Sequence, residues 1–450
     1  MAATVPAHGA PDLRQPARAA LWLGVYVALV VVPLFALLPD AHPGAGFTWD
    51  FAMALGYAAL AMLGVQFALT ARFRRATAPF GIDLIFYFHR YLAVLALLIA
   101  LAHYGLLKAA YPEVLGSADP AQAPAHMTAG RVALALFALL VVSSLLRRRL
   151  RIEYDFWRWT HALLATVAFG LALWHMLAAG RYLDTAWKEA LWAGYGAFWL
   201  ALIGWVRVLR PLRLARDPWR VVEVRPERGR VCTLVLEPAS GRPLRFRPGQ
   251  FGWLTLRASP FALKEHPFSI ASSAERGGRI ELSIKELGDF TRTIRHVRPG
   301  ETAYFDAPYG AFSVDLLPDA RGYVFVAGGI GIAPMLGQLR TLADRGDRRR
   351  HLLFYGSRCW ERVALREPVE ALRGRLDLTV VHVLHEPEPD WTGERGLITR
   401  DVLARHLPQP PDGFEFLLCG PTPMTRSVEA ALRSLGVPQG RVHSEIFDWV

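Results

Sequence analysis

The sequence predicts a membrane-embedded bundle of six helices, followed by a small β-barrel and an α/β domain. Two observations predict this order. Apolar residues are concentrated in the first half of the 450-residue chain, in segments of about twenty residues. The second half contains short alternating strands and then apolar strands that run into glycine-rich turns. We expect three domains, at 1–212, 213–318 and 319–450, because the chain is longer than one ordinary domain.

The composition narrows the function classes. The formal net charge of +12 does not indicate nucleic-acid binding, because the arginine runs flank apolar segments and have no interleaved aromatic residues. The three cysteines, Cys232, Cys359 and Cys419, have spacings that fit neither a zinc site nor a disulfide framework. The first apolar run has spanning length and no signal-cleavage pattern, so we expect it to be retained.

Six segments approach the roughly 20 apolar residues that a helix needs to cross a membrane. They lie at 20–38, 51–73, 84–107, 130–146, 157–177 and 190–208. Arginines gather in every second connection, whereas the other connections carry mainly acidic residues. The arginine-bearing segments are 14–18, 72–75, 147–151 and 207–216. The positive-inside rule therefore predicts a multi-pass protein of the cell (inner or plasma) membrane, with its N-terminus and its second half in the cytosol.

Four histidines lie inside the spans, in two pairs with equal spacing. His89 and His103 are on the third span, and His161 and His175 are on the fifth, 14 residues apart in each case. Fourteen steps of about 100° place both members on one helix face, about 21 Å apart along the axis. A lone histidine in a membrane can simply bond to a neighbouring helix. Because both spans start from the same side, however, the pairs match in depth.

This arrangement supplies two imidazoles at each of two depths. Two imidazoles from facing helices are the usual axial ligands of a b-type haem. We therefore predict two haem b groups, one held by His89 and His161 and the other by His103 and His175.

The barrel contains two motifs that suit a flavin. The run His266-Pro267-Phe268-Ser269 offers an aromatic face and a hydroxyl, and the run at 284–291 ends a strand and opens a helix that Thr291 is placed to cap. Free N–H groups at a helix start suit a pyrophosphate. Ordinary turn and cap chemistry would explain each motif equally well.

The α/β domain contains a candidate nucleotide crevice. Residues 323–335 form an apolar strand that runs into Gly328, Gly329 and Gly331 and then a helix, a nucleotide turn that differs from GxGxxG. Strands at 352–355 and 416–418 end at the same edge. After the first of these, Ser357 and Arg358 would suit the 2′-phosphate of NADPH, although a surface arginine would look the same and NADH is the alternative.

The third strand ends in Cys419, Gly420 and Pro421, where the nicotinamide would lie. The thiol of Cys419 would serve equally well as a small buried group. The sequence therefore leaves a catalytic and a structural interpretation of this residue open.

Taken together, the order of these motifs resembles the ferric reductase and NADPH oxidase superfamily, particularly the bacterial oxidases, over nearly the whole chain. The resemblance implies a ferredoxin–NADP reductase-like second half. It implies FAD contacts from His266, Pro267, Phe268, Ser269, Lys285, Gly288 and Thr291. The phosphates of NADPH would lie on the run that contains Gly328, Gly329, Gly331 and Pro334, and the nicotinamide on Cys419, Gly420 and Pro421. Phe447, or alternatively Trp449, would stack on the flavin until nicotinamide displaces it.

The implied enzyme passes electrons from cytosolic NADPH through FAD and two haems to an acceptor across the membrane, either dioxygen, giving superoxide, or a ferric chelate. One alternative is a haem-quinone reductase that serves a lipid or a partner protein in the bilayer. Another is a non-catalytic membrane scaffold with a vestigial flavin half, which the intact motifs argue against. We expect contact with membrane lipid and none with nucleic acid, and the sequence leaves the oligomeric state open.

Overall fold

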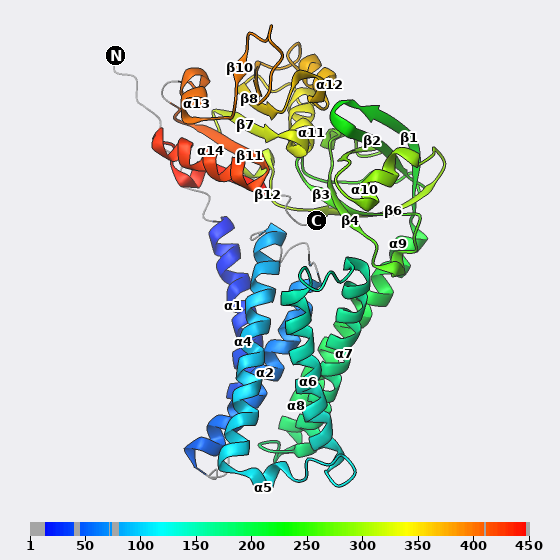
Figure 1. The fold of residues 1–450 in the computed structure, drawn as a ribbon, viewed down its shortest axis with the longest axis vertical. Coiled ribbons are helices and arrows are strands. Elements are labelled where there is room, and N and C mark those ends of the chain that lie inside the picture. Colours follow the sequence, from blue (N-terminus) through cyan, green and yellow to red (C-terminus); the bar gives the residue numbers. More distant parts are fainter. Residues whose placement is uncertain (1–13, 40–45, 72, 74–80, 409–410, 447–450) are drawn as a thin grey trace. The chain divides into compact units, whose positions relative to one another are not determined.

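The computed structural model describes residues 14–39, 46–71, 73, 81–408 and 411–446. These residues form two compact units (Figure 1). The helical unit lies within Ala10–Leu212, and the sheet unit runs from Arg213 onwards. The order of a helical membrane region, an antiparallel barrel and a parallel α/β sheet confirms the predicted fold class.

The helical unit is a bundle of long helices with a short helix across one end (Figure 1). Its helices are α1 (Arg14–Phe35), α2 (Phe47–Thr70), α4 (Gly81–Ala110), α5 (Pro112–Leu115), α6 (Ala125–Leu146), α7 (Tyr154–Ala179), α8 (Ala186–Gly204) and α9 (Arg210–Arg216). The described residues of each of the six predicted spans are mostly helical, although the first and second predicted spans run about three residues past the ends of α1 and α2. Among the described residues, five helices have spanning length and composition, and the apolar part of α1, Ala20–Phe35, is shorter.

Helix α2 lies at the centre of the bundle. Its Leu60, Ala61 and Val65 are buried, whereas Leu98 on α4 and Leu139 on α6 are exposed. Helices that present large apolar side chains outward are suited to lipid. We call the end with α5 the α5 end, and the end where Arg147 follows α6 the arginine end. The arginines of segment 72–75 lie outside the described residues.

The first part of the sheet unit is an antiparallel sheet with the strand order β4-β3-β6-β1-β2-β5. Its elements are β1 (Trp219–Glu227), β2 (Val231–Pro238), β3 (Phe251–Leu256), β4 (His266–Ser269), β5 (Ile280–Lys285), α10 (Asp289–Thr293) and β6 (Thr302–Tyr309). The predicted strands fall within β1, β2 and β3. Alternating apolar side chains, including Leu234, Leu254 and Leu282, meet in one core.

The second part is a parallel sheet with the order β10-β9-β8-β7-β11-β12. Its elements are β7 (Gly322–Gly328), α11 (Ile332–Asp344), β8 (Arg350–Ser357), α12 (Arg366–Leu372), β9 (Leu378–Leu384), β10 (Glu394–Arg395), α13 (Arg400–His406), β11 (Phe414–Gly420), α14 (Thr422–Ser434) and β12 (Val442–Ile446). Strand β7 is buried throughout, because Phe325 packs with α11 and α12 while Val324 packs with α13 and α14.

Candidate functional site

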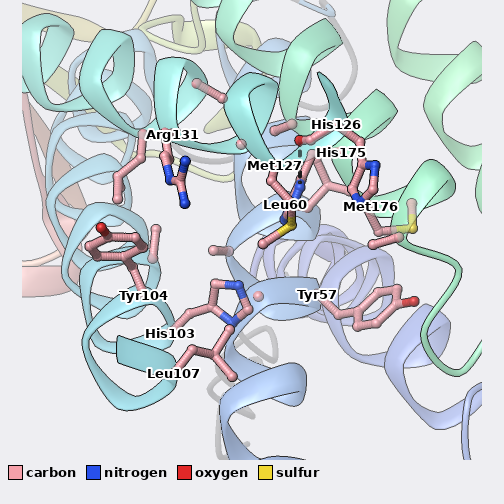
Figure 2. Close-up of a pocket in the computed structure, with 18 of the residues that line it drawn as sticks. Tyr57, Leu60, His103, Tyr104, Leu107, His126, Met127, Arg131, His175 and Met176 are labelled. Carbon is pink, nitrogen blue, oxygen red and sulfur yellow. Dashed lines mark hydrogen bonds between the residues drawn. The ribbon is translucent and has the colours of Figure 1, made fainter. Parts of the chain in front are cut away.

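A cavity of about 260 Å³ lies at the α5 end of the helical unit (Figure 2). His103 of α4 and His175 of α7 line it, so the structure brings this predicted pair to one place. Most of the other lining side chains are apolar, such as Leu60 and Phe137. A largely apolar pocket with a few convergent polar groups is the usual form of a cofactor site.

Backbone carbonyls orient both rings. Nδ1 of His103 donates to the carbonyl oxygen of Ala52 at 2.7 Å, and Nδ1 of His175 donates to that of His126 at 2.9 Å. A carbonyl oxygen only accepts, so Nδ1 carries the ring proton and Nε2 keeps its lone pair. Metal-binding histidines are commonly oriented in this way. The chemistry of both rings therefore fits an axial ligand of haem.

Two glycines make room for these rings. A Cβ atom at Gly56 of α2 would lie 2.9 Å from the His103 ring, and one at Gly130 of α6 would lie 2.8 Å from the His175 ring. Carbon atoms pack best at about 3.5–4.0 Å, so any larger residue would displace the imidazoles. The position of each histidine thus depends on a glycine of a neighbouring helix.

The second pair, His89 of α4 and His161 of α7, lies nearer the arginine end. The two ring centroids are 6.3 Å apart, and the ring planes are inclined by 70°. Two metal–imidazole bonds of about 2.0–2.1 Å plus the ring radii would separate the centroids by about 6 Å, so this spacing fits one iron between the rings.

The two rings of this pair have different surroundings. Nδ1 of His161 lies 3.3 Å from Oγ of Ser144, and its ring lies 5.0 Å from that of Trp157. Nδ1 of His89 is buried without a hydrogen-bond partner among the described residues. Buried polar atoms rarely stay unpaired, which makes His89 a candidate for contact with a bound group.

Sequence reasoning missed two polar residues of the cavity, His126 and Arg131 of α6. The His126 ring lies 6.3 Å from that of His175, with planes inclined by 24°, although it is the His126 carbonyl that holds His175. Arg131 lies inside the fourth predicted span, at the end that is poor in arginine. A basic residue within an apolar span was the signal available for it.

In the barrel, β4 and α10 bring the predicted flavin residues together. The His266 ring stacks on the Phe290 ring with centroids 3.8 Å apart. The centroid of the Phe268 ring lies 6.1 Å from that of Phe290. Oγ of Thr291 accepts the N–H groups of Leu287 and Gly288 at 2.8 and 2.9 Å, so it does cap the start of α10.

Next to Phe268, Ser269 is buried, and its hydroxyl has no partner among the described residues. Pro267 occupies the neighbouring strand position, where it pairs with Trp253 of β3. A buried hydroxyl without a partner fits the predicted flavin contact of Ser269, which stays a prediction.

Lys285 at the end of β5 reaches the glycine turn of the parallel sheet. Its Nζ lies 3.5 Å from the place where a Cβ of Gly329 would stand. Burial lowers the pKa of Lys285, and the nearby charges of Arg362 and Arg230 lower it further. No carboxylate pairs with Lys285 in the described part of the chain. A cluster of cations beside a glycine turn fits a pyrophosphate.

The other glycines of this region are tightly packed, Gly331 against backbone and Gly328 and Gly420 also against the side chain of Met424. A Cβ at Gly331 would meet the carbonyl oxygen of Cys419 at 2.1 Å, and one at Gly420 would meet Cα of Gly328 at 3.1 Å. These three glycines let the ends of β7 and β11 approach closely. Gly329, with φ of +55°, is the member that faces Lys285.

The remaining predicted residues lie around this edge of the sheet. Cys419 is fully buried in the core beside Ala327, and Pro334 is buried in α11. Pro421 directly precedes α14, and its Cδ atom would lie 2.9 Å from a Cβ placed on Gly328. Phe447 and Trp449 lie outside the described residues.

Arg358 has a partner that the sequence did not indicate. It follows Ser357 at the end of β8, and its Nε lies 2.7 Å from a carboxylate oxygen of Glu386 beyond β9. Both side chains are exposed. A nucleotide phosphate at Arg358 would therefore compete with this carboxylate.

Contacts between α11 and the barrel fix the two sheets of this unit relative to each other. Arg340 donates to Glu281 of β5 at 2.7 Å and to the carbonyl of Ala271 at 2.9 Å. The amide oxygen of Gln338 accepts the N–H of Val314 at 2.9 Å. These bonds hold the flavin motifs and the glycine turn on one rigid frame.

Comparison with known proteins agrees with this division. Residues 55–173 match the family described as ferric reductase like transmembrane component, residues 220–311 match an FAD-binding domain, and residues 325–430 match an oxidoreductase NAD-binding domain.

Three individual relatives each match about half of the chain or less. Ferredoxin–NADP reductase B of Sorangium cellulosum is 31% identical over 241 residues, which are 51% of this chain and 96% of that protein. NADH-cytochrome b5 reductase 1 of Pyricularia oryzae is 32% identical over 186 residues, 40% of this chain, and the chain spans 60% of its length. Among solved structures, the cytochrome P450 reductase GcoB of Amycolatopsis has a TM-score of 0.46 and 24% identity, covering 51% of this chain and 69% of that one.

Proposed function

This chain belongs to the ferric reductase and NADPH oxidase superfamily, and from that premise we propose a transmembrane electron-transfer enzyme with two haems. Its FAD-binding and NAD-binding domains make it an NAD(P)H-dependent oxidoreductase. Several apolar helices make it a membrane protein. The proposal adds the haem ligands, the direction of transfer and the acceptor.

In this proposal, the four histidines hold two haems. His103 and His175 would bind one haem at the α5 end, and His89 and His161 would bind the other at the arginine end. The observation that carries this assignment is the pair of bonds from Nδ1 of His103 and His175 to backbone carbonyls, since these leave Nε2 of both rings free in one cavity. When bound, haem carries one electron at a time.

The sheet unit would bind FAD and the nicotinamide nucleotide. Bound FAD would supply the chemistry that links a two-electron hydride donor to one-electron carriers. His266, Pro267, Phe268 and Ser269 would hold the flavin ring, with Gly288 and Thr291 shaping the helix start beside it. Lys285 would contact FAD, the turn of Gly328, Gly329, Gly331 and Pro334 would hold the phosphates of the nicotinamide nucleotide, and Gly420 and Pro421 would lie at the nicotinamide. Phe447 would stack on the flavin, and Cys419 would pack behind the nicotinamide.

NADPH is the proposed donor. Ser357 and Arg358 would meet its 2′-phosphate, and the phosphate would have to displace Glu386 from Arg358. The arginine-bearing connections support a cell-membrane location with the sheet unit on the cytosolic side. Dioxygen or a ferric chelate would then take the electrons on the opposite side.

The proposal is tested by measuring the haem and FAD content per chain and then the reduction of the haems by NADPH. Purified protein in detergent is expected to contain two haem irons and one FAD per chain. Under anaerobic conditions, NADPH should reduce both haems, as seen in their absorption bands. Exposure to oxygen with and without superoxide dismutase, and separately to ferric chelate, identifies the acceptor. Fewer than two haem irons per chain, or haems that NADPH leaves oxidised, would refute the proposal.

A further inference from the structure

Arg131 places a guanidinium at the cavity of the α5 end. Figure 2 shows its side chain pointing into the space that His103 and Tyr104 also border. One Nη atom donates to the carbonyl of Ser117 at 2.7 Å, and the other donates to that of Leu115 at 2.6 Å and, at a longer 3.5 Å, to that of Gly116. A guanidinium has five N–H donors, so these bonds fix its plane and leave other donors unused.

The positive charge of Arg131 has no negative partner among the described residues. All three of its acceptors are neutral carbonyls, and none of the described residues that line the cavity carries a carboxylate. The acidic groups near this end are engaged elsewhere or exposed. Asp184 pairs with Lys188 at 2.9 Å, Asp50 accepts from Tyr182, Asp119 accepts the N–H of Ala121, and Glu113 and Glu189 are exposed.

The surroundings of Arg131 favour an anion. The other polar groups of the described lining are imidazoles, phenols and Arg181, whose guanidinium lies 5.6 Å above the ring of Trp49. An ionised side chain within a membrane protein is costly, and although backbone carbonyls satisfy some of its donors, they leave its net charge uncompensated, so an anion is favoured there. A planar guanidinium with fixed orientation matches a carboxylate in two-point geometry.

We propose that Arg131 makes the cavity of the α5 end a binding site for a carboxylate-bearing ligand. The inference rests on the proposed function and deepens it. Two sources supply this chemistry at this place: the propionates of a haem held by His103 and His175, and the carboxylates of a ferric chelate such as ferric citrate. Both would add charge-assisted hydrogen bonds to the donors that Leu115 and Ser117 leave free.

The experiment compares Arg131→Gln with Lys108→Gln in the full-length holoprotein. Lys108 lies in the last turn of α4 at the same end of the bundle, is exposed and does not line the cavity, so its variant removes the same charge away from the cavity. Arg131→Lys keeps the charge and loses the planar geometry. Anaerobic haem reduction by NADPH is measured in all variants, and this separates a failure of the proposed function from a failure of the inference.

Two readouts distinguish the sources. If the carboxylate is a propionate, haem loss to a scavenger protein becomes faster by about tenfold or more in Arg131→Gln. If it belongs to the chelate, haem retention is unchanged, KM for ferric citrate rises about tenfold with kcat kept, and iron-free citrate no longer stabilises the variant against heat. A cationic ferric complex without carboxylates should show no change in KM.

Either pattern supports the inference, and Arg131→Lys should lie between Arg131→Gln and the unmodified protein. The inference is overturned if Arg131→Gln matches Lys108→Gln in haem retention, in KM for ferric citrate and in stabilisation by citrate.

Discussion

In the helical unit, backbone carbonyls hold the rings of His103 and His175, which lie against glycines, whereas charged side chains such as Arg340 and Glu281 fix the frame of the sheet unit. A backbone carbonyl is not protonated at ordinary pH, and salt weakens its hydrogen bonds little. In an ion pair, by contrast, acid can protonate the carboxylate and salt can screen the attraction. The comparison teaches that steric fit and carbonyl bonds position the histidine rings of the helical unit, while charge positions the flavin and nucleotide motifs of the sheet unit. The following variants test that distinction.

The largest effect is expected from His161→Leu. Leucine offers no ligand to pair with His89, so the protein should lose one of its two haems and keep FAD. Haem iron and flavin per chain are measured in the purified variant. His126→Leu is the control and should keep both haems, because the backbone carbonyl of His126 that orients His175 remains in the variant. Two haems in His161→Leu would contradict the assigned ligands.

Gly130→Ala should have the next largest effect. The added Cβ would lie 2.8 Å from the His175 ring and force it from its place, so haem content at the α5 end should fall by about half or more. Gly170→Ala is the matched control, because a Cβ at Gly170 on α7 has no neighbour within 4 Å. Equal haem content in both variants would mean that steric fit does not position this ring.

Glu281→Gln tests the role of charge in the sheet unit. Burial tends to raise the pKa of Glu281, but Arg340 and Arg225 outweigh it and lower the pKa below its usual 4.5. The carboxylate therefore stabilises the fold fully above pH 4.5, and this contribution is lost as pH falls through the lowered native value.

The variant should lose about 1–3 kcal/mol at pH 7, and the loss should shrink under acid. Both the loss at pH 7 and its decrease under acid are measured by urea unfolding at pH 7 and at pH values below 4.5, with flavin release as the signal of unfolding. Glu223→Gln, which removes an exposed partner of Arg225, should cost less than about 1 kcal/mol. A loss that is independent of pH would argue that Glu281 acts through packing.

The smallest effect is expected from Ser144→Ala. The 3.3 Å contact between Oγ of Ser144 and Nδ1 of His161 is long, so its removal should cost less than about 1 kcal/mol. Both haems should remain, with a small change in midpoint potential at one of them. Haem loss comparable to that of Gly130→Ala would show that Ser144 positions His161 as firmly as the carbonyls position the other pair.

The sequence predicted much of this organisation, because hydropathy and strand alternation report burial directly. The 14-residue spacing on two helices of like direction also predicted which histidines would meet. Gly56 and Gly130 were beyond prediction, since their role depends on the rotation of α2 and α6 against their neighbours.

Other contacts were missed for a related reason. Arg131 bonds to backbone carbonyls, which no side-chain pattern reveals, and the Arg358–Glu386 pair joins two loops that meet only in the folded sheet. Cys419 was left open between two roles because a cysteine at this strand end could be either a small buried core residue or a contact of the nicotinamide, and its burial is compatible with both.

The fit between His103 and Gly56 has a consequence for chemical control of the molecule. Replacing His103 by glycine would leave a gap of the size of one ring, with the Ala52 carbonyl at its edge. Free imidazole added to the buffer could enter such a gap, donate its N–H to that oxygen and present its second nitrogen inward, as small aromatic molecules fill engineered cavities. If His103 ligates a haem as proposed, this variant would transfer electrons only while imidazole is present in the buffer.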